Sequence, residues 1–182
     1  PTESILFNID IEGPINKDKT AVLRVFAKVF YNHCGFYGED LKIAKLERFI
    51  DRQGKTEAFR AAFREINGDD WVNVRDSAAF FDDVVETLQS VLGMSETAAR
   101  NWFNGEENAD MSIKQLVADI KEYVDSKGDP FRLLFCVDEV GQYIGEDGDL
   151  MMNLQSLVEE IGDKCRGKVW VMVTSQEAID SV

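Results

Sequence analysis

The chain has 182 residues, of which 45% are hydrophobic and 30% are charged, proportions typical of a folded domain that buries one substantial core. Its net charge of −14 disfavours direct contact with nucleic acid, because phosphate binding needs clustered Lys and Arg. No segment reaches the roughly 20 apolar residues of a membrane helix, and the first residues lack a signal-peptide pattern, so we expect a cytoplasmic protein without membrane contact.

Residues 4–11 (SILFNIDI) are apolar and β-prone up to the break at Gly13 and Pro14, and they predict a first strand that ends near Asp10. A long helical block follows, with Ser95 and Ser112 as expected helix N-caps. Helical spacing of apolar residues predicts helices at about 18–33, 39–52, 55–66, 76–92, 95–103 and 112–127. We therefore predict a helical insertion subdomain over residues 18–127.

Two short apolar strands are predicted near the C-terminal end, at 132–137 and 169–173. Each run is apolar throughout, as expected of a strand that is buried on both faces of a parallel sheet. A helix predicted at 150–161 supplies the crossover that parallel strands require. The expected fold is therefore α/β, with residues 1–17 and 128–182 forming the sheet core.

Polar residues follow directly after both of these strands. Asp138 and Glu139 end the first, and Thr174, Ser175 and Gln176 end the second. Ligands bind at the carboxyl ends of the strands in open α/β sheets. In phosphoryl transfer one carboxylate at such an end helps to hold Mg²⁺, and a second orients and deprotonates the attacking water. The alternative for both clusters is an ordinary strand end with a polar loop cap.

Other short motifs do not indicate a site. Gly54-Lys55-Thr56 resembles the end of a phosphate loop, but the pattern GxxxxGK[ST] needs glycine at position 49, which is Phe49. The acidic segment 145–149 does not match a calcium loop. His33 beside Cys34 is a weak candidate for a base and nucleophile, and three widely spaced cysteines indicate reduced thiols.

Three segments carry a specific resemblance: 133–145 (LLFCVDEVGQYIG), 150–155 (LMMNLQ) and 169–177 (VWVMVTSQE). Together with ILFNID near the N-terminus and GKTEAFRAAF at 54–63, they closely resemble the BrxC/PglY family, the large P-loop ATPases of BREX bacteriophage-resistance systems. The resemblance extends over nearly the whole chain and is strongest from 133 to 180.

This resemblance implies an AAA+-like P-loop NTPase with a three-layer core and strand order 5-1-4-3-2, of which the chain carries parallel strands 2, 3 and 4. The chain would be an internal fragment that begins after the phosphate-loop helix and lacks the Walker A loop. Asp138 would be the Walker B residue at the Mg²⁺ site and Glu139 the catalytic base. Thr174 and Ser175 would stand at the nucleotide-binding sensor-1 position, where Asn is more usual.

The resemblance also implies ATP and Mg²⁺ as cofactors of the full-length protein, with none expected on the isolated fragment, which would be inactive. The parent would couple ATP hydrolysis to conformational change in a defence complex, with other defence-system proteins as partners. Strand 169–173 would lack its neighbour, and its free apolar edge favours pairing with a second copy.

Two other functions remain open. The helical insertion could serve mainly as a protein-docking module beside a degenerate nucleotide site. The acidic strand end could also belong to another AAA+ or STAND-type NTPase.

Overall fold

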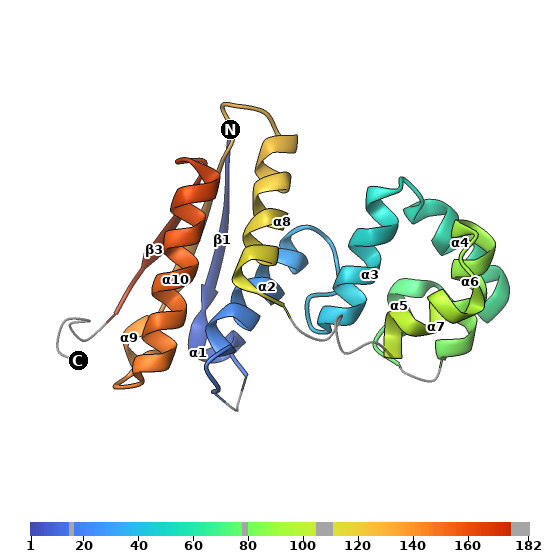
Figure 1. Cartoon of the computed structure of the whole chain (residues 1–182), viewed down its shortest axis with the longest axis horizontal. Helices are drawn as coiled ribbons and strands as arrows, with labels where there is room; N and C mark the ends of the chain where they lie inside the picture. The colour runs from blue at the N-terminus through green and yellow to red at the C-terminus, as the bar shows by residue number, and fades with distance from the viewer. Residues whose placement is uncertain (15–16, 78–79, 105–110, 176–182) are drawn as a thin grey trace. The chain divides into compact units, whose positions relative to one another are not determined.

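The computed structural model describes residues 1–14, 17–77, 80–104 and 111–175. The chain divides into two compact units, one formed by Pro1–His33 with Met111–Val182 and the other by Cys34–Asp110 (Figure 1). Helices α2 (Ala21–His33) and α8 (Ile113–Ser126) belong to the unit that contains the sheet. The helical insertion is therefore shorter than the predicted range of 18–127.

The first unit is built on three parallel strands, β1 (Thr2–Asn8), β2 (Arg132–Asp138) and β3 (Val169–Val173), paired in the order β1-β2-β3. The register aligns Asn8 with Asp138 and Val137 with Val173, so the carboxyl ends of all three strands meet at one edge. This parallel sheet with helical connections confirms the predicted α/β class. The connection from β2 to β3 contains α9 (Val140–Ile144) and α10 (Gly148–Cys165).

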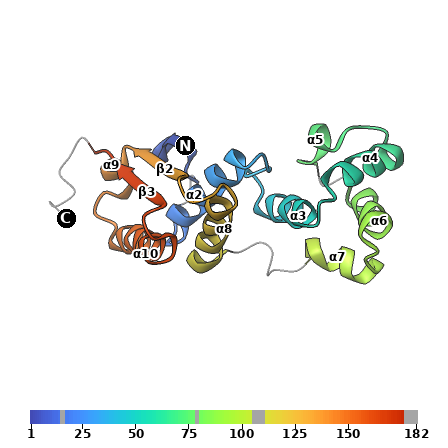
Figure 2. The same cartoon turned by 90° about the horizontal axis from the view of Figure 1, so that it is seen from above.

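Helices α2, α8 and α10 lie on one face of the sheet. This arrangement can be followed in Figure 2, where the sheet unit is seen from above. These helices bury the alternate strand residues that face them, and the Phe26 ring of α2 packs against Phe7 at 5.4 Å and Phe135 at 5.3 Å. In the part of the chain that the structure describes, the opposite face is exposed, with Leu6 73% and Trp170 61% exposed. The expectation of strands buried on both faces is therefore wrong, and the described residues form two layers where three were predicted.

The first strand begins and ends about two residues earlier than predicted from the segment 4–11, in which a strand end near Asp10 was expected. It begins at Thr2 and ends at Asn8, whose side-chain oxygen accepts hydrogen bonds from the backbone N–H groups of Asp10 and Ile11. This N-cap starts the short helix α1 (Ile9–Glu12). Ile9 and Ile11, which continue the strand pattern in the sequence, therefore lie in a helix. The predicted cap at Ser112 is confirmed, because Ser112 and Gln115 form a reciprocal capping box at the start of α8.

The two chain segments that join the units are tied together inside the first unit. Tyr31, near the end of α2, is fully buried, and its hydroxyl donates to the Asp119 carboxylate at 2.7 Å. The same hydroxyl lies 4.0 Å from the Met111 sulfur. The chain therefore leaves this unit after His33 and returns to it at Met111 near a single buried side chain.

The second unit has its own core of helices. They are α3 (Leu41–Arg52), α4 (Thr56–Asn67), α5 (Trp71–Val74), α6 (Phe81–Leu92) and α7 (Glu96–Asn104). Phe59, Phe63 and Trp71 pack ring against ring in its centre, with centroids 5.2 to 6.2 Å apart. Four of these helices match predicted ones within a few residues, and α5 was not predicted. Among the residues described, no helix is long and apolar enough to cross a membrane.

Candidate functional site at the carboxyl edge of the sheet

The chain turns sharply where β2 ends. Asp138 is the last strand residue, and Glu139 follows with φ 62° and ψ 30°, in the left-handed region. Only Glu139 and Arg166 have positive φ among the described non-glycine residues. A side chain in this region costs about 1 kcal/mol of backbone strain, so the turn is held by the structure around it. It directs the main chain from the sheet into α9.

The ends of β2 and β3 are tied together by main-chain and side-chain hydrogen bonds. Thr174 N–H donates to the Val137 carbonyl at 2.9 Å, and Val140 N–H donates to the Thr174 carbonyl at 3.1 Å. The Thr174 hydroxyl donates to Oδ1 of Asp138, which also accepts from Glu139 N–H at 3.0 Å. Two donors therefore hold one carboxylate oxygen of Asp138. These hydrogen bonds also fix the orientation of the side chain.

A shallow hollow of about 450 Å³ lies beside this hydrogen-bonded pair. Asp138 and Thr174 line it together with Asn8 at the end of β1, and its floor is formed by Leu6, Cys136 and Met172. Asp138 and Thr174 are both exposed, so a ligand reaches them directly from solvent. The hollow thus combines a polar rim at the carboxyl edge with an apolar floor.

The described residues contain no group of three or more His, Cys, Asp or Glu side chains that would hold a metal alone. A cation at this edge would be held by Asp138 and the Thr174 hydroxyl, and would complete its shell with water or ligand oxygens. Mg²⁺ binds proteins in this manner, through one or two carboxylates with several waters or phosphate oxygens. The donor set therefore fits a nucleotide-linked Mg²⁺ better than a closed structural metal site.

The structure brings two of the four predicted site residues into direct contact, Asp138 and Thr174. Glu139 and Ser175 lie next to them in the chain and are half-buried. Gln176 lies outside the described residues. Sequence reasoning missed Asn8, although a parallel register that places the end of β1 beside Asp138 would have identified it.

The motifs that the sequence argues against have structural roles. Gly54 adopts φ 65° in the turn between α3 and α4, so Gly54-Lys55-Thr56 is a helix break as expected. His33 lies 2.7 Å from the Glu3 carboxylate, which also accepts from the Tyr123 hydroxyl at 2.6 Å. These hydrogen bonds, the one from Tyr123 first, lower the pKa of Glu3. The group joins β1, α2 and α8.

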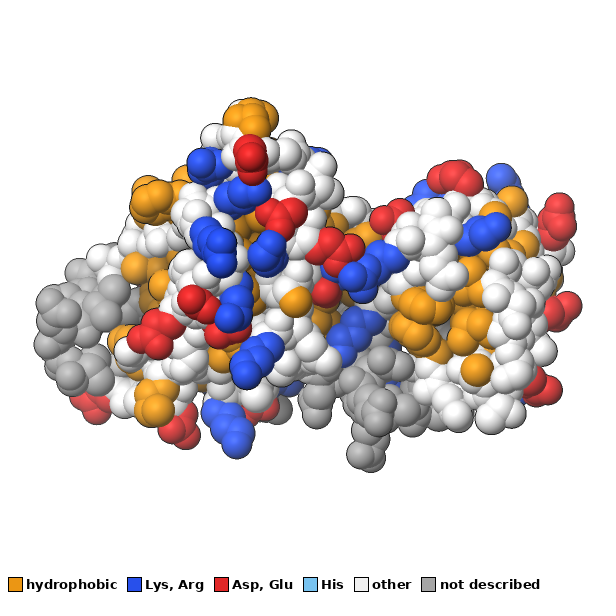
Figure 3. All heavy atoms as spheres, turned by 45° about the horizontal axis from the view of Figure 1, so that its top comes forward, with side chains coloured by type: hydrophobic (Ala, Val, Ile, Leu, Met, Phe, Trp, Pro, Cys, Tyr) orange, Lys and Arg blue, Asp and Glu red, His pale blue; other side chains and the backbone are white. Residues whose placement is uncertain are grey.

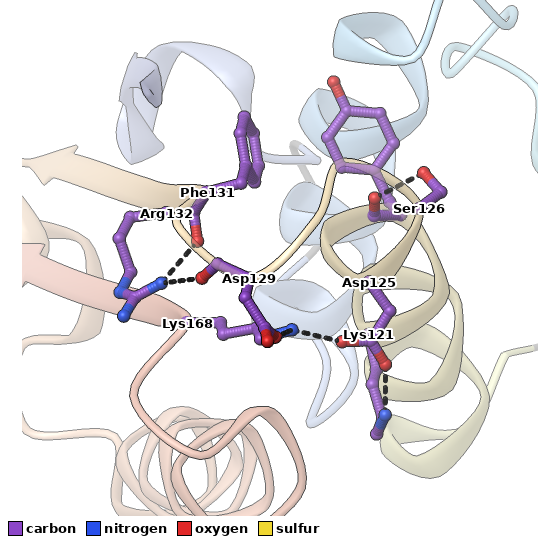
Figure 4. Close-up of polar contacts among 8 residues, drawn as sticks. Lys121, Asp125, Ser126, Asp129, Phe131, Arg132 and Lys168 are labelled. Carbon is purple, nitrogen blue, oxygen red and sulfur yellow. Dashed lines mark hydrogen bonds and ion pairs between the residues drawn. The ribbon is translucent and has the colours of Figure 1, made fainter.

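The opposite, amino edge of the sheet carries a larger hollow of about 560 Å³, lined mainly by charged residues. Basic and acidic side chains are intermixed on this side of the molecule (Figure 3). In Figure 4, Lys168 reaches Asp125 at 2.9 Å, and it lies 3.2 Å from Asp129. Lys121 also pairs with Asp125, and these hydrogen bonds, the one from Lys121 first, lower the pKa of that carboxyl group. The two lysines are therefore neutralised by their own neighbours, which disfavours an anion site.

Cys165 also lines this hollow. Its thiol is buried, and burial raises its pKa to about 11. Because the thiolate is the reactive form, this cysteine is not a nucleophile near neutral pH. The carboxyl edge therefore remains the stronger candidate site.

Comparison with known proteins finds no family model that matches the chain and no solved structure that matches it. The residues at the carboxyl edge and their geometry are therefore the basis for assigning a function.

Proposed function

We propose that the α/β unit provides the Walker B and sensor-1 part of a P-loop ATPase of the BREX bacteriophage-resistance type. The observation that carries the proposal is the hydrogen bond from Thr174 to Asp138, which joins the polar ends of two neighbouring parallel strands. An acidic strand end beside a hydroxyl-bearing one is the arrangement that such an enzyme needs where Mg²⁺ and the terminal phosphate meet.

Each residue has a distinct role in this proposal. Asp138, together with the Thr174 hydroxyl, would hold Mg²⁺, and the hydrogen bonds to Oδ1 keep the Asp138 carboxylate from rotating. Bound Mg²⁺ would neutralise charge on the ATP phosphates. Glu139 accepts a proton from the attacking water as general base. Ser175 and Thr174 take the sensor-1 role at the same edge, where their hydroxyl groups would bind the nucleotide.

The sheet order supports this assignment. Strands 2, 3 and 4 of the proposed fold are neighbours in the order 4-3-2, and β3-β2-β1 are parallel neighbours in that same order. In this proposal the phosphate loop comes from a segment outside the 182 residues. That segment adds a strand to the free edge of β3, and ATP is hydrolysed only when both parts are present.

Metal binding can be tested on the chain itself. We expect Mn²⁺, used as a paramagnetic substitute for Mg²⁺, to broaden the amide signals of residues 8, 138, 139 and 174. Asp138→Asn should abolish this broadening, whereas Asp149→Asn, a change at an exposed acid in the first turn of α10, should not. Equal broadening in the Asp138→Asn protein would contradict a metal site at the carboxyl edge.

Catalysis is tested in the full-length protein that contains the phosphate loop. Glu139→Gln should reduce ATP turnover by a factor of about 10² to 10⁴, the usual contribution of a general base, and should leave ATP binding intact. Turnover equal to that of the parent protein would remove Glu139 from the mechanism.

The separate core of the helical unit supports a second proposal, that residues 34–110 dock a partner protein. A hollow of about 330 Å³ on this unit is lined by aromatic side chains, Trp71, Phe80 and Phe81, and also by Arg75. Aromatic and Arg side chains are enriched at protein interfaces. Loss of partner binding in the full-length protein on Phe81→Ser, with ATP turnover retained, would support this role.

A further inference from the structure

The face of the sheet that α2, α8 and α10 leave open is apolar. Leu6 is 73% exposed, Trp170 61% and Met172 56%, and Leu134 and Cys136 between them are half-buried. Parallel sheets occur almost only with both faces covered, and contiguous exposed apolar side chains mark an interaction surface. We call these five residues, with Ser4, the open face.

The strand register orders the open face into rows. Ser4, Leu134 and Trp170 form one row across the sheet, and Leu6, Cys136 and Met172 form the next. Arg132 and Asp138 lie on the same side of β2 as these rows. Arg132 precedes the first row along the strand, and Asp138 follows the second. The open face is therefore uncharged in the middle, basic at one end and acidic at the other.

This pattern is complementary to itself. We propose that the open face is the interface of a symmetric dimer, in which two copies stack sheet on sheet with their strands antiparallel. The two-fold axis lies between the sheets and crosses the strands at the level of Phe135. It places Trp170 over Met172 of the second copy, and Leu134 over Cys136 of the second copy. Arg132 then faces Asp138 of the second copy at both ends.

The groups that make these contacts remain accessible. Arg132 uses one nitrogen, Nη1, to donate to the carbonyls of Asp129 and Phe131, which leaves its other N–H groups available. Asp138 is held through Oδ1. Sulfur next to an aromatic ring, as for Met172 over Trp170, is a favourable contact. The dimer thus contains two charge pairs and four apolar contacts, and each copy supplies one member of every one of them.

The charges also exclude the other ways of pairing this face. A two-fold axis parallel to the strands would place Arg132 on Arg132 and Asp138 on Asp138, and like charges in an interface are strongly unfavourable. Pairing along the outer edge of β3, the arrangement expected from the sequence, would leave Leu6 in solvent. The antiparallel stack alone covers the apolar rows and matches the charges.

The size of the face sets the strength of the dimer. Strands of seven residues that rise about 3.3 Å per residue and lie about 4.8 Å apart give the face a flat area of roughly 300 Å² per copy. Even when side-chain relief is added, two such faces bury less than the roughly 1,600 Å² of a standard interface. An area of this size is typical of weak, transient interfaces, so we expect a dissociation constant on the order of micromolar or weaker. This inference does not depend on the proposed ATPase function. Because the dimer engages Asp138 and covers the hollow at the carboxyl edge, dimer formation and Mg²⁺ binding at Asp138 exclude one another.

Sedimentation equilibrium of the chain from low micromolar to millimolar concentration tests the proposal. The expected result is a reversible monomer–dimer equilibrium, with a dissociation constant raised more than about tenfold by Leu6→Glu, because this change buries an unpaired charge. The matched control is Met152→Glu, a change at a 66% exposed side chain on α10 outside the open face. A monomer at millimolar concentration, or a dimer that Leu6→Glu leaves intact, overturns the proposal.

A charge exchange and a crosslink fix the orientation. Arg132→Asp alone should weaken the dimer, and Asp138→Arg in the same chain should restore it, because the exchanged pair again matches its copy. In a Cys34→Ser, Cys165→Ala background, Leu134→Cys should form a disulfide between copies with Cys136. Crosslinking through Cys136 of both copies without the change at Leu134 would indicate the parallel stack and refute the antiparallel one.

Discussion

The helical unit contains a buried carboxylate whose replacement should be costly. Glu47 accepts hydrogen bonds at Oε1 from Trp71 Nε1 at 2.7 Å and from Arg75 at 2.8 Å. Its Oε2 accepts from the backbone N–H of Tyr37 at 2.6 Å. The side chains of Glu47 and Arg75 are only 10% and 17% exposed. All three partners are donors, so the site requires two acceptor oxygens.

Glu47→Gln keeps the shape of the side chain and replaces one of these oxygens by an NH₂ group. In either amide orientation an N–H then points at another N–H, and the charge that strengthens the remaining bonds is lost. Hydrogen bonds to a charged group contribute about 1.5–3 kcal/mol each, and an unsatisfied buried donor costs about 1–3 kcal/mol. In the better orientation the NH₂ group faces the Tyr37 amide and the two bonds to Oε1 survive in weakened form, so we expect the free energy of unfolding to fall by about 2–4 kcal/mol.

Urea unfolding of the full chain, followed by tryptophan fluorescence and by hydrogen exchange at the Tyr37 amide, measures this loss. Glu96→Gln is the matched control, because Glu96 pairs with Arg100 on the exposed surface of α7 and is 60% exposed. Its removal should change stability by less than about 0.5 kcal/mol. A Glu47→Gln protein as stable as the control would refute the argument that the three donors depend on this carboxylate.

Three further predictions concern the first unit. Gly13→Ala should destabilise the protein by about 1–3 kcal/mol, because the added Cβ would lie 2.6 Å from the Ile9 carbonyl oxygen. Gly162→Ala, where the added Cβ meets open space on α10, should stabilise it by about 0.5–1 kcal/mol. Thermal unfolding measures both changes. Ser112→Ala should cost about 1 kcal/mol by removing the capping box of α8. The pKa of Asp125 is lowered, so its stabilising effect is present above the unfolded value of about 3.9 and is lost as the pH falls through the lower folded value. Unfolding of Asp125→Asn should therefore depend less on pH in this range, and an unchanged dependence would contradict the ion pairs with Lys121 and Lys168.

The sequence was sufficient to predict the parallel strands and the approximate positions of most helices. Continuous apolar runs beside a helix of crossover length identified β2 and β3, and the rule that strand ends meet at one edge placed Asp138 near Thr174. These predictions depend on local pattern and chain direction. The structure matches these predictions because few other arrangements of the strands satisfy both the apolar pattern and the parallel chain direction.

The open face shows why the number of layers was not predictable. Trp170 and Met172 are apolar, and an apolar strand indicates which residues favour burial but not what covers them. The end of β1 was missed for a local reason, since Ile9 and Ile11 continue the strand pattern while the Asn8 side chain starts a helix. The left-handed turn at Glu139 has no sequence signal, because glutamate rarely adopts this conformation.

The positions of Tyr31 and Met111 have a consequence for how this chain can vary. The chain leaves the α/β unit and returns to it at neighbouring points. For the stability of this unit, the intervening residues are therefore equivalent to one surface loop. The entropy of closing such a loop rises only as the logarithm of its length, by about 0.6 kcal/mol for each doubling. Segments of very different size could thus be exchanged between α2 and α8 at little thermodynamic cost, leaving Asp138 and Thr174 in place while the exchanged part acquires new specificity.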